Sequence, residues 1–171
     1  MKIEYDNIMD DLLNFSEHHS MNSPRIKKKM SVFKYTFPIL VLIIIIPVII
    51  TNPTKNITIW FVVSVIWFFA APYYYRYAIR RSSLKMYNEG ENKGVLTKHT
   101  LILNEEGIIE ETNYNTTKLK WDSIEKIVKD YRYIYIYIGA VSAFIVPIRS
   151  FSSSISFNDF YHELIKLKYN A

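Results

Sequence analysis

Few residues in this 171-residue chain have the types and spacing that catalysis or metal binding requires. There is no cysteine, which excludes disulfides, zinc–thiolate sites and thiol nucleophiles together. The histidines are His18, His19, His99 and His162. His18 and His19 are adjacent and would diverge by about 100° on a helix, so they cannot share one face. We expect all four to be exposed polar residues, and we predict no metal site, because its ligands must converge from several elements.

The other polar clusters are typical of a structural protein rather than an enzyme. Glu105–Glu106 and Glu110–Glu111 flank a predicted hairpin turn, where solvated carboxylates are common. The serines at 150 and 152–154 lack the strand–turn–helix pattern of a nucleophile elbow. The four glycines are never closer than four residues apart, which excludes phosphate-binding and dinucleotide-binding loops. We therefore predict no catalytic residue, no cofactor and no enzymatic activity.

Two side-chain types remain as candidates for recognition. Tyrosine recurs at every second position from 131 to 137, which predicts one face of a strand, half-buried against a helix or a membrane surface. Arg149 stands alone after an apolar run, where its guanidinium can bind a carboxylate or a phosphate. We predict a candidate interaction surface at Tyr135, Tyr137 and Arg149. Replacing His99, His162 and Arg149 together by alanine is expected to leave the fold intact.

The net charge of +5 is concentrated next to the apolar part of the chain. A pI of 9.2 would ordinarily suggest a nucleic-acid partner. Here the basic residues flank membrane-length segments, which is the positive-inside pattern, and we expect no nucleic acid as a partner. The flanking basic residues are Arg25, Lys27, Lys28 and Lys29 before the first segment and Arg76, Arg80 and Arg81 after the second.

Two adjacent runs, residues 35–51 and 57–75, contain no Asp, Glu, Lys, Arg or His. Each is long enough to cross the hydrocarbon core as a helix of about 26–28 Å. We predict a transmembrane hairpin that turns at residues 52–56, with Lys55 as the only charge in the loop. The basic flanks place both termini in the cytoplasm and the chain in the cell membrane. Neither run contains an ionisable residue or a glycine, so an anchor is favoured over a channel or transporter.

The regions outside these runs predict α and β elements. Residues 6–21 have the periodicity of an amphipathic helix with Asp6 or Asn7 as its N-cap, and residues 1–5 suit a short strand. We expect this head to pack on the C-terminal domain or on a partner. A final amphipathic helix begins with Ser156 as its N-cap, paired with Asp159. The predicted strands are 101–103, 108–112, 116–121, 131–138 and 141–148, while 123–130 suits either a helical turn or a strand.

These patterns predict four segments in an α+β membrane protein. They are a cytoplasmic N-terminal segment at 1–33, the transmembrane hairpin at 34–75, a basic juxtamembrane linker at 76–93 and a β-rich cytoplasmic domain at 94–171. The last domain is a small antiparallel sheet structure closed by the C-terminal helix. It is short for an independent core, so we expect the N-terminal segment or the membrane surface to support it.

Several motifs follow one another in a recognisable order. An acidic head and basic residues precede the two spans, and then come Trp121-Asp122-Ser123-Ile124, the Tyr/Ile strand and Pro147-Ile148-Arg149-Ser150-Phe151 before a Phe-rich helix. In this order the chain resembles the YcxB-like family of Bacillota membrane proteins. The resemblance implies a cytoplasmic domain similar to pleckstrin-homology-like bacterial modules, and it implies no particular reaction.

Two functions from different classes fit these expectations. The first is a membrane-tethered, non-enzymatic interaction module whose domain binds a protein segment or a lipid headgroup at the inner face of the membrane. The alternative is a self-immunity protein that protects the membrane against a peptide toxin or bacteriocin. Deleting residues 94–171 would abolish the first function, whereas immunity resident in the spans would survive.

Overall fold

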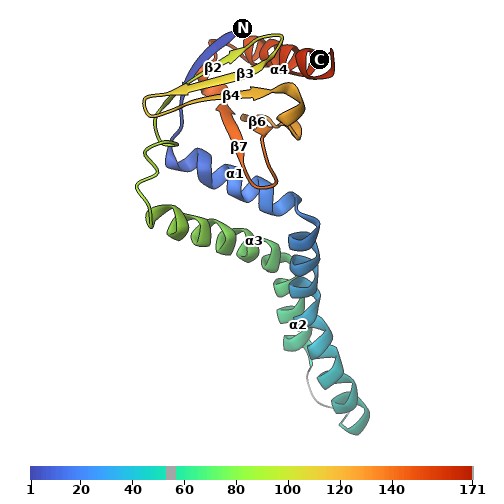
Figure 1. Ribbon diagram of the computed structural model, residues 1–171. Coiled ribbons are helices and arrows are strands. Elements are labelled where there is room, and N and C mark those ends of the chain that lie inside the picture. Colours follow the sequence, from blue (N-terminus) through green and yellow to red (C-terminus); the bar gives the residue numbers. More distant parts are fainter. Residues whose placement is uncertain (53–56, 171) are drawn as a thin grey trace. The chain divides into compact units, whose positions relative to one another are not determined.

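The chain folds into two compact units in the computed structural model, which describes residues 1–52 and 57–170 (Figure 1). One unit joins Met1–Phe15 to Tyr87–Ala171, and the other is Ser16–Met86. The sequence predicted that residues 1–33 form a segment of their own. Instead, the first fifteen residues belong to the β-rich unit, and helix α1 (Met9–Asn22) continues from one unit into the other. The expected packing of the head on the C-terminal domain is thus confirmed.

Two long helices make up most of the second unit. Helix α2 (Pro24–Thr51) begins with a proline, which suits the first helical turn because no backbone N–H is needed there. Helix α3 (Thr58–Asn88) includes the second apolar run and continues through most of the predicted linker. It continues because Arg, Ala, Leu, Lys and Met favour helix and no glycine occurs before Gly90. The predicted turn lies largely outside the described residues, since 53–56, with Lys55, are among those not described.

Aromatic side chains join α2 to α3. The Trp67 ring lies 5.0 Å from Phe33 and 5.2 Å from Phe37 between centroids, and its Nε1 donates a hydrogen bond to the Phe33 carbonyl at 3.3 Å. Figure 1 shows the two helices side by side and α3 changing direction along its length. Pro72 lies within α3, where it removes one helical hydrogen bond and allows such a bend.

The β-rich unit contains two antiparallel sheets. The first has the order β1-β2-β3-β4 and the second β5-β6-β7, so neighbours in sequence are neighbours in space. The predicted strands are confirmed within a few residues, although Trp121 belongs to a 3-10 turn at Trp121–Ser123 rather than to the strand before it. The ambiguous stretch 123–130 contains strand β5. The strands are β1 (Lys2–Asp6), β2 (Lys98–Leu103), β3 (Gly107–Thr112), β4 (Thr116–Lys120), β5 (Lys126–Lys129), β6 (Tyr133–Tyr137) and β7 (Ala143–Pro147).

Gly107 begins β3 at a position that only glycine fits. A Cβ at this position would lie 1.9 Å from the Leu119 carbonyl oxygen on β4, far inside any permissible contact. The Asn104 side chain accepts a hydrogen bond from the Gly107 N–H at 2.8 Å and closes the turn. The hairpin turn that the sequence predicted beside Glu105–Glu106 is therefore confirmed.

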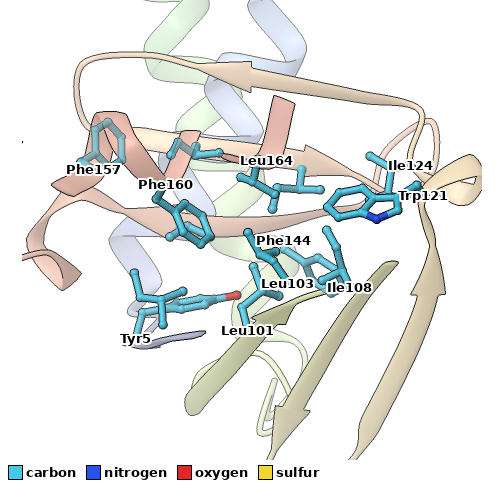
Figure 2. Close-up of a cluster of buried hydrophobic side chains, with 14 residues drawn as sticks. Tyr5, Leu101, Leu103, Ile108, Trp121, Ile124, Phe144, Phe157, Phe160 and Leu164 are labelled. Carbon is cyan, nitrogen blue, oxygen red and sulfur yellow. The ribbon is translucent and has the colours of Figure 1, made fainter. Parts of the chain in front are cut away.

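The main core lies between the two sheets and helix α4 (Ser154–Asn170) (Figure 2). Phe157, Phe160 and Leu164 of α4 pack there beside Trp121 and Phe144. The predicted closing helix is confirmed, but its cap is not Ser156. The helix begins two residues earlier, and the Ser153 hydroxyl accepts a hydrogen bond from the Ser156 N–H at 3.1 Å, as an N-cap side chain does.

Candidate functional site

Strand β6 is buried on both faces, and the first helix covers one of them. Ile134 and Ile136 point into the main core, whereas Tyr133, Tyr135 and Tyr137 form the opposite side, here called the tyrosine face. The Phe15 ring of α1 lies 5.6 Å from the Tyr135 ring and 5.7 Å from that of Tyr137. The tyrosines recur every second residue because that is the period of a strand, and here their shared face meets a helix.

This arrangement corrects the predicted interaction surface. Tyr135 and Tyr137 are only 1% and 2% exposed, so neither ring is available to a partner while α1 is in place. The sequence shows the periodicity of the face but not what covers it, since the covering helix lies more than a hundred residues earlier.

Next to the tyrosine face, Asp11 forms a buried ion pair with Arg149. The Asp11 carboxylate is 0% exposed. Arg149 binds it in bidentate fashion, with Nη1 donating to Oδ1 at 2.7 Å and Nη2 donating to Oδ2 at 2.5 Å. The Tyr133 hydroxyl donates to Oδ1 at 2.9 Å, and the Ile8 N–H donates to Oδ2 at 2.8 Å. Four donors thus satisfy a carboxylate that would be very costly to bury alone. We call Asp11, Arg149, Tyr133 and Asn14 the Asp11 cluster.

Arg149 therefore acts as a structural clamp, because its guanidinium binds groups of the same chain rather than an external ligand. Besides Asp11, its Nη2 donates to the Asp6 carbonyl at 2.7 Å, so one guanidinium holds both the end of β1 and the start of α1. Its side chain is 44% exposed, but its polar atoms bind the chain's own residues. Asn14 completes the cluster by donating to the Tyr133 hydroxyl at 3.0 Å.

The electrostatics of the cluster favour a fixed charge state. Burial raises the pKa of Asp11, but hydrogen bonds from Arg149, the Ile8 N–H and Tyr133 outweigh it and leave the pKa below its ordinary value. Burial and the adjacent Asp11 carboxylate raise the pKa of Tyr133. The carboxylate stays ionised and the phenol stays protonated at neutral pH, so these groups hold the helix rather than exchange protons.

Sequence reasoning missed Asp11, Tyr133 and Asn14 as members of this cluster. A signal was present, because Ile8, Asp11, Leu12 and Phe15 follow helical spacing and place an acid on the apolar face. The helix also begins later than predicted. Its first residue is Met9, so neither Asp6 nor Asn7 is the cap, and the Asp11 carboxylate satisfies the N–H of Ile8 instead.

A second buried charge lies at His99 on β2, which the sequence predicted to be exposed. The side chain is buried, its Nδ1 is 2.8 Å from Glu110 Oε1, and its Nε2 is 2.8 Å from the Val95 carbonyl. The Tyr5 ring of β1 stacks on it at 5.1 Å. Burial lowers the pKa of His99, but Glu110 and the Val95 carbonyl raise it more, so the net pKa lies above its ordinary value. Because both ring nitrogens face acceptors, the imidazolium is the form that fits.

The remaining histidines are more exposed than His99. His162 is exposed, as predicted, and His18 and His19 are half-buried on α1. Within the residues that the structure describes, no three His, Asp or Glu side chains converge as metal ligands would. Since Arg149 binds the buried Asp11 carboxylate and His99 is itself buried beside Glu110, replacing them by alanine is now expected to destabilise the fold rather than leave it intact.

The basic residues that flank the apolar runs lie at one end of the helical unit. Arg25, Lys27, Lys28 and Lys29 are exposed in the first turns of α2. On α3, Arg76 and Arg80 approach the Glu17 carboxylate at 3.9 and 4.0 Å, and Arg81 is exposed. Partly exposed pairs at this distance contribute little to stability.

The β-rich unit also has an open edge. Strand β4 is the last in the order β1-β2-β3-β4, so in the described part of the chain no further strand pairs with its outer side. Lys118 and Lys120 are exposed along it. A hollow of about 660 Å³ lies beside them, lined among others by Glu106, Ile109 and Leu119.

Fold and site together define a small antiparallel α+β domain, clamped to its own N-terminal strand and helix, in a chain with two long apolar helices. Residues 103–164 match the family model described as YcxB-like protein, which confirms for this part of the chain the resemblance stated from the sequence. The match includes Tyr133 and Arg149 but not Asp11 or His99. No curated protein and no solved structure matched the chain.

Proposed function

We propose that this chain is a membrane-anchored, non-enzymatic interaction module. Helices α2 and α3 cross the cell membrane as a hairpin, both termini lie in the cytoplasm, and the YcxB-like domain binds a protein segment at the inner face. The observation that carries the proposal is the exposure of the two apolar helices. Their most apolar windows have mean hydropathies of 2.4 and 1.4, yet only 11% and 6% of those windows is buried within the chain.

This exposure supports a membrane rather than a soluble core. A core helix of a soluble protein is covered by other elements, whereas Ile43, Ile44, Phe61 and Ile66 are each more than half exposed. An uncovered apolar surface of this extent needs another apolar medium or a partner. The basic residues at one end of the hairpin support the orientation, because positive charge stays on the cytoplasmic side.

The YcxB-like domain is proposed to be pleckstrin-homology-like. Its sheets of four and three antiparallel strands, with a C-terminal helix closing the space between them, support this reading. Its candidate chemical groups have structural partners, since Asp11 binds Arg149 and His99 binds Glu110, which supports a binding role rather than a catalytic one.

The open edge of β4 replaces the tyrosine face as the candidate binding surface. Its outer backbone groups can pair with an extended segment, and Lys118 and Lys120 favour acidic side chains on that segment. The same lysines repel a second copy of β4, which reduces edge-to-edge self-association. Tethering at the membrane raises the local concentration, so a roughly micromolar site would suffice.

The membrane part is tested by fractionation and topology. We expect the full chain to stay in the membrane pellet after alkaline carbonate extraction and reporter fusions at both termini to report the cytoplasm. A chain released by carbonate, or a C-terminus labelled from outside the cell, would contradict it.

The binding part is tested in the same membranes by photo-crosslinking from position 118. We expect a protein adduct from position 118 that is lost in Lys120→Glu and kept in Lys166→Glu, an exposed charge reversal on α4. An adduct with lipid alone, or a protein adduct that persists in Lys120→Glu, would rule out a protein segment at β4. If a strain that lacks the gene is sensitive to a peptide toxin, and a chain without residues 94–171 still protects it, immunity would be favoured instead.

A further inference from the structure

Helices α2 and α3 do not close on each other along their whole length, and an apolar groove runs between them. Its volume is about 500 Å³, which lies within the range of ligand-binding cavities. On α2 it extends from Pro38 to Ile49, a rise of roughly 16 Å for a helix. On α3 it extends from Phe61 to Phe69.

The groove offers no polar group to an occupant along its described length. Ser64 is the one hydroxyl among its lining residues, and its Oγ donates back to the Trp60 carbonyl at 2.8 Å. Bulky side chains such as Phe61 and Phe68 hold the helices apart at this level. Neither helix contains a glycine, so the small-residue surfaces that let another transmembrane helix approach closely are missing. A flexible hydrocarbon chain fits these walls better than a helix from a second copy.

A lysine lies at one end of the groove. Lys34 precedes Pro38 by four residues on α2, so it continues the same helical face by one turn. Its ammonium lies 3.7 Å from the centroid of Phe68, itself a lining residue. Among the described residues, no carboxylate forms an ion pair with Lys34. The groove therefore combines an apolar channel with a cation at its cytoplasmic end.

We propose that this groove binds one anionic phospholipid, with an acyl chain between α2 and α3 and the phosphate at Lys34. This inference rests on the proposed membrane insertion, because the cytoplasmic end of the hairpin is where headgroups lie. The acyl chain alone provides no selectivity, since any lipid tail is equally apolar. Selectivity arises from Lys34, which the Phe68 ring holds at the entrance while its ammonium keeps donors for a phosphate oxygen.

The test is native mass spectrometry of the full chain released from mixed micelles that contain equal amounts of phosphatidylglycerol and phosphatidylcholine. We expect one phosphatidylglycerol to be retained in preference to phosphatidylcholine. Lys34→Gln should reduce that preference about fivefold, the effect of one lysine at an anionic surface, and Lys34→Arg should restore it. Lys29→Gln is the matched control, because it removes an exposed cation from the same flank on another face of the helix.

A second pair of variants tests the acyl-chain part of the site. Val65→Trp fills the groove and should displace the retained lipid, whereas Ile66→Trp adds the same ring at a neighbouring position that does not line it. The inference would be overturned by equal retention of both lipids or by equal effects of Lys34→Gln and Lys29→Gln. It would also be overturned by equal retention in both tryptophan variants, or by a chain dimer in place of a lipid adduct. Carbonate extraction of the same variants separates the two proposals. A chain that stays in the membrane without selective lipid refutes only the groove, whereas a chain that is released refutes the membrane anchor as well.

Discussion

Asp11 and His99 are buried titratable groups that join elements far apart in the sequence. Asp11 on α1 meets Arg149 near the C-terminal end, and His99 on β2 lies between Tyr5 and Glu110. A buried charge destabilises the fold when its partner is removed, because it is then left without compensation. At the residue scale, the N-terminal head is therefore held by electrostatic contacts as well as by apolar packing.

Removing the Arg149 guanidinium should destabilise the fold, because the buried Asp11 carboxylate then loses its charged partner. We expect Arg149→Ala to lower the free energy of unfolding by about 2–3 kcal/mol, since the carboxylate keeps only the Tyr133 and Ile8 donors. Arg132→Ala is the control, because Arg132 makes a longer, exposed contact of 3.4 Å with Asn14 and should cost under about 1 kcal/mol. Denaturant unfolding of the full chain in micelles, followed by near-UV circular dichroism, measures both. Similar losses in the two variants would contradict the clamp role.

His99 should make stability depend on pH. Its pKa is raised in the folded state, so its contribution is fully present below the unfolded pKa of about 6.5 and is lost as the pH rises through the folded pKa. The free energy of unfolding should therefore fall as the pH rises above about 6.5. Glu110→Gln should flatten the change, because it removes the main charged partner. His162→Gln, at an exposed position, should leave the slope as it is, and a wild-type slope in Glu110→Gln would show that another group is responsible.

At the scale of elements, strand β6 is a central strand with two buried faces, one against the main core and one against α1. The strand alternates Ile with Tyr, so the large aromatic rings meet the helix and the branched aliphatic chains meet the core. Phe15, whose ring packs beside Tyr135 and Tyr137, is the last α1 residue that belongs to the β-rich unit.

Truncating the Phe15 ring should loosen α1 on the tyrosine face. We expect Phe15→Ala to cost about 3 kcal/mol, because the buried ring contacts Tyr135 and Tyr137 and leaves a cavity when removed. Amide hydrogen exchange should rise in residues 9–15 and in β6 more than in β2 and β3. Ile8→Ala is the control, since that side chain is more than half exposed and should change exchange little. Uniformly increased exchange would indicate global destabilisation rather than release of the helix.

At the scale of the whole molecule, the β-rich unit is discontinuous in sequence. Strand β1 pairs with β2, for example at Ile3 and Leu101, although the two apolar helices lie between them along the chain. The amino group of Met1 also donates to the Leu103 carbonyl at 2.9 Å. The unit therefore combines two segments that are far apart in the sequence.

Deleting residues 1–15 should therefore unfold the β-rich unit rather than merely shorten the chain. The deletion removes β1, the Asp11 carboxylate and the Phe15 ring at once, and it leaves the edge of β2 and the tyrosine face exposed. We expect limited proteolysis in membranes to digest residues 94–171 rapidly in this variant. A chain ending at Lys168, which loses the exposed Tyr169 and Asn170 together with Ala171, should stay resistant. A protease-resistant domain in the N-terminal deletion would contradict the discontinuous fold.

The local features of this protein are visible in its amino-acid sequence. Charge-free runs of membrane length predicted α2 and α3, alternation predicted the strands, and the Trp121–Ile124 and Pro147–Phe151 motifs indicated the YcxB-like segment. These features depend on residues close together in the chain, where helical and strand periodicities are directly visible.

Only the tertiary structure decided what covers the tyrosine face and what Arg149 binds. Periodicity shows that Tyr135 and Tyr137 share a side of β6, but burial depends on α1, and Asp11 meets Arg149 across 138 positions of sequence. The same holds for His99, whose four-percent exposure and charge depend on Glu110 across the sheet and on Tyr5 from the other end of the chain. A side chain's burial and charge are set by its neighbours in space, and a single sequence records only its neighbours in the chain.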